Sequence, residues 1–153
     1  MSFSAMKTVW ATLTRGSTVV ADRPESGVLD TCVYIDLGLL DPADLPAMPE
    51  LTAVTVAELH QGVAMAGDAA SRAARTEKLG AAIVDFEPLP FDGQAAARYG
   101  TLVALTMAAN RNPKPRRTDL MIAAVASSRG LPLYTRNAED FKGLDDMVTI
   151  IEV

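Results

Sequence analysis

Four acidic residues stand beside apolar runs at irregular intervals along the chain: Asp30, Glu58, Asp119 and Asp140. Carboxylates at the ends of helices and strands can converge in space although they are far apart in sequence. Because gathered carboxylates repel one another, such a cluster favours a hard divalent cation, and oxygen ligands suit Mg²⁺ or Mn²⁺. The pattern therefore predicts metal-assisted chemistry on a phosphate ester.

Each acid also has a simpler structural explanation. Glu58 follows Thr55 in a Thr-x-x-Glu capping box, and Asp119 falls in a first helical turn, where the helix dipole favours a carboxylate. Asp30 could cap the next helix, and Asp140 could be a turn residue. The shared site is favoured because Asp119 borders an almost wholly apolar run, where an unpaired carboxylate costs free energy.

Composition indicates one folded domain. The chain has 153 residues, of which 49% are hydrophobic and 22% charged, enough to bury a sizeable core. Cys32 is the only cysteine, so no intrachain disulfide can form, which fits a reducing compartment. No apolar run approaches the roughly 18 residues of a membrane span, and the N-terminus lacks a secretory pattern. We expect a cytoplasmic protein without membrane association.

The charge distribution is uneven. A net charge of −5 argues against a general nucleic-acid binder, although a metal bound among the acids would offset part of it. Basic residues cluster within 111–117, where Lys114, Arg116 and Arg117 could contact phosphates or form an ordinary solvated loop.

Other chemistries find little support. His60, the only histidine, is expected to be a partly exposed helix residue, and Cys32 a small core residue without an activating partner. With one histidine and one cysteine, the sequence gives very little support for a zinc site. Neither a P-loop nor a Gly-x-Gly-x-x-Gly fingerprint is present.

Periodicity predicts an α/β fold. Short strands alternate with helical segments, which favours a layered fold with a mostly parallel sheet. Ligand sites in such sheets form beyond the carboxyl ends of the strands, where Asp30 and the 135–140 loop are expected. Residues 41–50 contain three prolines and are predicted to be a loop. The expected strands are 27–30, 131–134 and 148–153, and the expected helices start after Asp30, at Thr55, Ala69 and Asp92, and at Thr118 or Asp119.

Residues 1–26 differ in composition from the rest and are predicted to be an N-terminal extension of unknown role. An added strand, a flexible arm or a start codon placed too early, with Met6 as the second candidate, all remain open. The predicted domain is 27–153.

The ordered set of acidic motifs resembles the PIN-domain ribonucleases, and most closely the VapC toxins of type II toxin–antitoxin pairs. Leu29-Asp30-Thr31 looks like the first motif. Three further segments are similar to the second, third and fourth motifs of the family: Thr55–Gly62, Arg117–Ala124 and Thr135–Phe141, the last containing Asn-x-x-Asp-Phe. The resemblance covers about residues 27–153, and the extension before it departs from the family pattern.

The resemblance implies a three-layer α/β/α PIN-like fold and a Mg²⁺- or Mn²⁺-dependent endoribonuclease. It assigns Asp30, Glu58, Asp119 and Asp140 to the catalytic and metal site, with support from Thr135 and Asn137. It also implies a homodimer and a cognate VapB-type antitoxin that covers the site.

Three alternatives differ in class. One is a catalytically silent PIN-like module that only binds RNA or protein, although all four acids are present. Another is a small-molecule phosphatase of the haloacid-dehalogenase type, which would need an acid where Cys32 stands. The third is a structure-specific DNA nuclease of similar fold, against which the small size argues.

Overall fold

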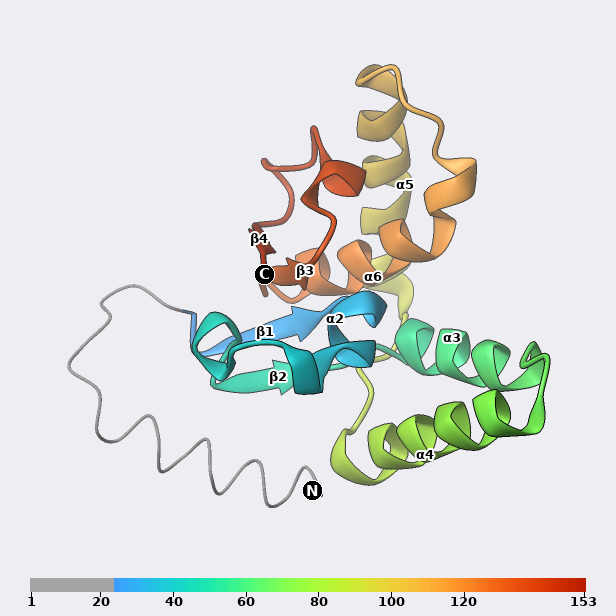
Figure 1. The fold of residues 1–153 in the computed structure, drawn as a ribbon. Helices are drawn as coiled ribbons and strands as arrows, with labels where there is room; N and C mark the ends of the chain where they lie inside the picture. Colours follow the sequence, from blue (N-terminus) through green and yellow to red (C-terminus); the bar gives the residue numbers. More distant parts are fainter. Residues whose placement is uncertain (1–23) are drawn as a thin grey trace.

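The computed structural model describes residues 24–153, which form a parallel sheet between layers of helices (Figure 1). The strands are β1 (Ser26–Leu29), β2 (Met48–Glu50), β3 (Leu133–Thr135) and β4 (Ile150–Glu152), in the order β2-β1-β3-β4 with all pairings parallel. The helices are α2 (Thr31–Ile35), α3 (Ala53–Ala64), α4 (Ala69–Asp85), α5 (Gly93–Ala108) and α6 (Arg117–Ser128). Four 3-10 turns join them: η1 (Leu37–Leu39), η2 (Pro42–Asp44), η3 (Lys114–Arg116) and η4 (Ala138–Phe141).

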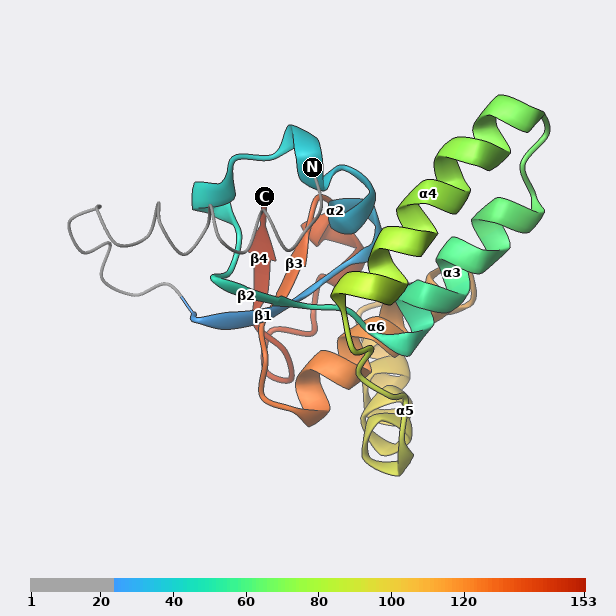
Figure 2. The same ribbon diagram turned by 90° about the horizontal axis from the view of Figure 1, so that it is seen from below.

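Alternation along the central strands divides the core in two. Val28 pairs with Leu133, and both pack with apolar residues of α5 and α6. Leu29 pairs with Tyr134, and both pack on the opposite face with residues of α2, α3 and α4. Successive side chains of a strand point to opposite faces, so these short strands anchor both outer layers. Figure 2 shows α5 and α6 on one side of the sheet and α2 on the other. The three-layer α/β/α prediction is confirmed.

Gly27 allows a close approach within the sheet. A Cβ atom at this position would lie 2.3 Å from Cε2 of Tyr134, closer than real contacts allow. Tyr134 is 1% exposed and belongs to the core between the sheet and α2. The glycine therefore leaves room for the largest fully buried side chain of the central strands.

Helix starts follow capping chemistry. The Asp92 carboxylate accepts a hydrogen bond from the amide of Ala95, which confirms Asp92 as the N-cap of α5. At the other end of the next helix, Gly130 takes φ +64, the left-handed conformation expected after a helix C-terminus. α6 itself begins at Arg117, slightly earlier than predicted.

The clearest fold error lies in the predicted 41–50 loop, which contains β2. Its three residues pair with β1, with Pro49 opposite Gly27. The Met48 amide donates to the Glu25 carbonyl at 2.8 Å, so the next backbone nitrogen, that of Pro49, faces away from β1. Proline is tolerated there because no ladder hydrogen bond is lost. The loop prediction, which rested on the three prolines, was therefore wrong for this edge strand.

Smaller differences concern element ends. α2 ends at Ile35 and a 3-10 turn continues the chain, so the helix after Asp30 is shorter than its apolar spacing suggested. β1 begins at Ser26, one residue before the predicted domain, and β3 and β4 shift or shorten by a few residues. The predicted extension lies almost wholly outside the described residues. Within residues 24–153, no helix is long and apolar enough to span a bilayer.

Candidate active site

Asp30 lies where β1 ends and α2 begins, and both carboxylate oxygens accept hydrogen bonds. Oδ1 accepts from the Thr31 amide at 2.8 Å, which makes Asp30 the N-cap of α2. Oδ2 accepts from the Thr135 hydroxyl at 2.8 Å and from the Cys32 thiol at 3.3 Å. Burial raises the pKa of Asp30 above its ordinary value, the three donors oppose that shift, and the Glu58 charge adds to it. Asp30 is therefore a fixed, buried carboxylate.

Glu58 lies within α3 rather than at its start, so the predicted capping box is wrong. The N-cap is Thr52, whose hydroxyl oxygen accepts from the Thr55 amide at 3.0 Å. Glu58 instead accepts a hydrogen bond at Oε2 from the Thr31 hydroxyl, across from α2. The simpler explanation for Glu58 is removed, and its carboxylate is tied to the residue that follows Asp30.

Asp119 occupies the first turn of α6, as predicted, but its environment is not that of an ordinary dipole residue. Its pKa is raised to about 6, first by burial and then by the charges of Asp30, Glu58 and Asp140, against a smaller lowering effect of Arg116. The Asp119 carboxylate has no hydrogen-bond or ion-pair partner among residues 24–153. Because the three other carboxylates act on its pKa, Asp119 lies within electrostatic reach of all of them.

Asp140 comes from η4, beyond the carboxyl end of β3. Oδ1 pairs with Nε of Arg116 at 3.3 Å, and Oδ2 accepts from the Asn137 side-chain amide. The Asn137 backbone amide in turn donates to the Thr135 hydroxyl oxygen at 3.1 Å, and this hydroxyl donates to Asp30. The chain of contacts links Asp140 to Asp30 through the two predicted supporting residues.

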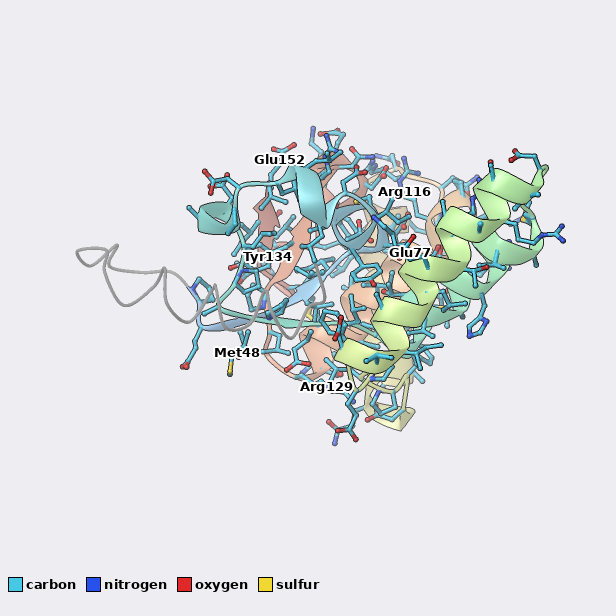
Figure 3. The ribbon with its side chains drawn as sticks, turned by 60° about the horizontal axis from the view of Figure 1, so that its bottom comes forward. Met48, Glu77, Arg116, Arg129, Tyr134 and Glu152 are labelled. Carbon is cyan, nitrogen blue, oxygen red and sulfur yellow. The ribbon has the colours of Figure 1, made fainter. Side chains whose placement is uncertain are left out.

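The acids gather at the carboxyl edge of the sheet, as parallel-sheet geometry predicts. Figure 3 shows Arg116 and Glu152, the last residue of β4, toward the same side of the molecule, whereas Met48 at the start of β2 lies on the opposite side. Asp30 and the η4 segment both follow strands that end at this edge. α6 brings Asp119 and α3 brings Glu58 from the flanking helices.

Two contributors carried no predicted role at the site. Thr31 stands in the first acidic motif and connects Asp30 to Glu58. Cys32 was expected to be a core residue, and it does pack against the core, but its sulfur also contacts Asp30 and lies 3.9 Å from the Thr135 hydroxyl. Their position directly after Asp30 was the available sequence signal. His60 is exposed on α3, as expected.

The basic segment divides into bound and unpaired cations. Arg116 is half-buried against Asp140, whereas Lys114 and Arg117 are exposed and, among the described residues, form no ion pair. η3 holds Lys114 and Arg116, and Arg117 opens α6. Two exposed positive charges thus lie in the segment that leads into the helix of Asp119.

The donor set suits a hard divalent cation, because it consists of carboxylate oxygens with raised pKa values at Asp30 and Asp119. Within residues 24–153, however, no three His, Cys, Asp or Glu side chains are arranged closely enough to hold a metal ion. Glu58 and Asp140 are engaged by protein donors instead: Thr31 contacts Glu58, and Arg116 and Asn137 contact Asp140.

Comparison with known proteins identifies the family of this chain. The chain is 40% identical to Ribonuclease VapC5 from Mycobacterium tuberculosis over 134 residues, which are 86% of this chain and 96% of the relative. The chain belongs to the VapC ribonuclease family. The identity to this relative confirms the VapC resemblance that was predicted from the order of the motifs. The chain matches no protein-family model.

Solved structures of VapC proteins and their relatives show the same fold. A member of the VapBC family of toxin–antitoxin systems from M. tuberculosis, VapBC-5, has 42% identity and a TM-score of 0.75 over 85% of this chain and 100% of its own. FitAcB from Neisseria gonorrhoeae has 28% identity and a TM-score of 0.63 over 82% of this chain and 96% of its own. The matches cover nearly the whole length of both neighbours.

Proposed function

We propose that this VapC family chain is the toxin of a toxin–antitoxin pair and cleaves RNA phosphodiester bonds with a Mg²⁺ or Mn²⁺ ion. The observation that carries the proposal is the environment of Asp119. Its carboxylate has no protein partner, and burial together with three other carboxylates raises its pKa to about 6. Repulsion by the neighbouring carboxylates favours a proton or a cation at this position, and at neutral pH, above the pKa, a divalent cation is the better match.

Asp30 and Asp119 are the proposed direct ligands, with Glu58 and Asp140 completing the shell or orienting its waters. A bound divalent cation would supply Lewis-acid stabilisation of the attacked phosphate and would activate a water. Thr135 and Thr31 hold Asp30 in place through its two oxygens. No protein nucleophile is required, which agrees with the raised pKa of the Cys32 thiol.

RNA would be positioned by charge rather than read by sequence. Lys114 and Arg117 are exposed beside the site and suit contacts to phosphates that flank the cleaved bond. Selection among RNAs would then depend on unpaired bases and on shape. The rival is a silent PIN-like binding module, and it differs from the enzyme in needing no metal.

The proposed partner is a VapB-type antitoxin, and the proposed assembly contains a homodimer of this chain. The antitoxin is supported by the 42% identical neighbour, which is a VapBC toxin–antitoxin structure with the fold shared over its full length. The homodimer is proposed from the family resemblance alone.

Asp119→Asn tests the function directly. The variant should remain folded, because it removes a repelled charge, and it should lose Mn²⁺ binding in titration calorimetry. Cleavage of single-stranded RNA should fall at least about a hundredfold, since the cation contributes several kcal/mol of charge stabilisation and 1.4 kcal/mol is tenfold.

Glu139→Gln is the matched control. Glu139 is an exposed acid in the same turn as Asp140 and pairs with Lys142 rather than with the site. It should bind Mn²⁺ and cleave RNA like the unaltered protein. Full cleavage by folded Asp119→Asn would reject the site, and Mn²⁺ binding without cleavage by the unaltered chain would favour the silent module.

A further inference from the structure

Arg116 is the cation of the candidate site. Its Nε lies 3.3 Å from Oδ1 of Asp140, with the two side chains 24% and 29% exposed. Among residues 24–153, no other lysine or arginine pairs with any of the four site acids. Its charge also lowers the pKa of Asp119. One guanidinium therefore faces two of the carboxylates proposed to bind the metal.

The backbone around Arg116 keeps the side chain near the acids. Its amide donates to the Pro113 carbonyl at 3.1 Å within η3, and Nη1 donates to the Asn112 carbonyl at 3.2 Å. Arg116 directly precedes α6, three residues before Asp119. A guanidinium tethered in this way can change partners without leaving the site.

Both carboxylate oxygens of Asp140 already accept a hydrogen bond. Oδ1 is engaged by Arg116 and Oδ2 by Asn137. Each oxygen keeps a further lone pair, but a divalent ion that approaches Asp140 meets the positive guanidinium beside it, so the two cations compete for the same carboxylate. Asn137 is neutral and is anchored through its backbone amide to Thr135, whereas Arg116 makes a single Nε contact and repels an incoming cation. Arg116 is the donor that should yield.

We propose that Arg116 and the divalent cation are alternative partners of Asp140, and that metal uptake releases the guanidinium to bind an RNA phosphate. The inference rests on the proposed function and adds a coupling within that site. A released guanidinium presents a planar fork of donors that fits phosphate oxygens. Metal and RNA would then each favour the binding of the other, because linkage between two ligands is reciprocal.

Titration calorimetry with Mn²⁺ alone tests the competition. Arg116→Gln removes the charge that occupies Asp140, so Mn²⁺ should bind about two- to fivefold more tightly than to the unaltered protein. That range corresponds to the strength of a partly exposed ion pair. The gain should disappear when Arg116→Gln is combined with Asp140→Asn, because the contested carboxylate is then absent.

Arg129→Gln is the matched control for net charge. Arg129 follows the opposite end of α6 and pairs with Asp92 at 3.2 Å, away from the site acids. It should leave Mn²⁺ affinity unchanged. Equal Mn²⁺ affinities for the Arg116 and Arg129 variants and the unaltered chain would overturn the competition but leave the proposed function intact. Absence of Mn²⁺ binding by the unaltered chain would instead reject the proposed function.

Binding of a short 2′-O-methyl oligoribonucleotide, verified intact by gel, tests the release step. Mn²⁺ should strengthen oligonucleotide binding to the unaltered protein, and Arg116→Gln should reduce that strengthening by about two- to fivefold, the same factor as above. Arg129→Gln should retain it. An undiminished effect of Mn²⁺ in Arg116→Gln would overturn the coupling, whatever the calorimetry of the ion alone shows.

Discussion

The two ends of α6 handle their polar groups in opposite ways. At the N-terminal end, Arg116 offers no side-chain cap, and Asp119 in the first turn has no hydrogen-bond partner in the described chain. At the C-terminal end, the Ser127 hydroxyl donates to the Met147 carbonyl at 2.7 Å, and Arg129 donates to the Pro90 carbonyl and pairs with Asp92. Arg116 and Arg129 lie on opposite sides of the molecule in Figure 3.

The difference separates the end that is proposed to be functional from a structural end. The half-buried Asp119 carboxylate lies near three other carboxylates and makes no side-chain contact within residues 24–153, which fits the cation site proposed above. Between the two ends, every residue from Leu120 to Ala126 is fully buried except Met121, which is half-buried. The rigid apolar middle allows one end to keep an unfavourable charge arrangement without losing the fold.

Leu120→Ala should have the largest effect on stability. The variant measures what the buried middle of α6 contributes. Leu120 is fully buried in the core beneath α5 and α6, and its truncation should lower the free energy of unfolding by about 2–5 kcal/mol. Urea denaturation measures the loss. Met107→Ala on α5, where the side chain is 61% exposed, should change stability by less than about 0.5 kcal/mol. Similar losses in both variants would contradict the assigned core.

Ser127→Ala should have an intermediate effect and acts only at the structural end. It leaves the Met147 carbonyl without its side-chain donor, which should lower the free energy of unfolding by about 1 kcal/mol. RNA cleavage per folded molecule should not change, since Ser127 lies at the end of the helix away from Asp119. A loss of cleavage with unchanged stability would show that the two ends are not separate.

The pH dependence of stability reports on the end of α6 that carries Asp119. In the metal-free protein Asp119 has a pKa of about 6 against an ordinary 3.8, so the folded chain binds its proton more tightly than the unfolded chain. The associated stability is present below about pH 4 and is lost as pH rises through about 6. Asp119→Asn should flatten this decline in urea denaturation with EDTA present. Identical slopes would mean that Asp119 is not perturbed.

The sequence predicted the layers of the fold, and the elements that carry the four acids, better than the contacts around those acids. Asp30 and Asp119 stood out as candidates because a carboxylate beside a strongly apolar run costs free energy unless it has a partner. The Thr55–Glu58 capping box failed because Thr52, three residues before Thr55, supplies an equally good cap. A local pattern cannot tell which of these two threonines caps the helix. Only the packing of the folded chain decides where the helix starts.

Other features depended on tertiary contacts that no local pattern encodes. The Arg116–Asp140 pair joins residues 24 positions apart, and the Cys32 contact to Thr135 spans 103. β2 was missed because its segment is rich in proline and because the strand is defined only by three residues that pair with β1. Strands this short are defined by their neighbours rather than by their own propensities.

Pro49 has a consequence for how the molecule meets its copies at high concentration. An exposed strand margin with free amide donors can recruit a strand from another molecule and start aggregation. Because the nitrogen of the buried Pro49 faces away from β1 and carries no hydrogen, the outer edge of β2 lacks an amide donor at the middle of its three residues. The same residue that concealed the strand in the sequence thus discourages cross-molecule sheet extension along this border.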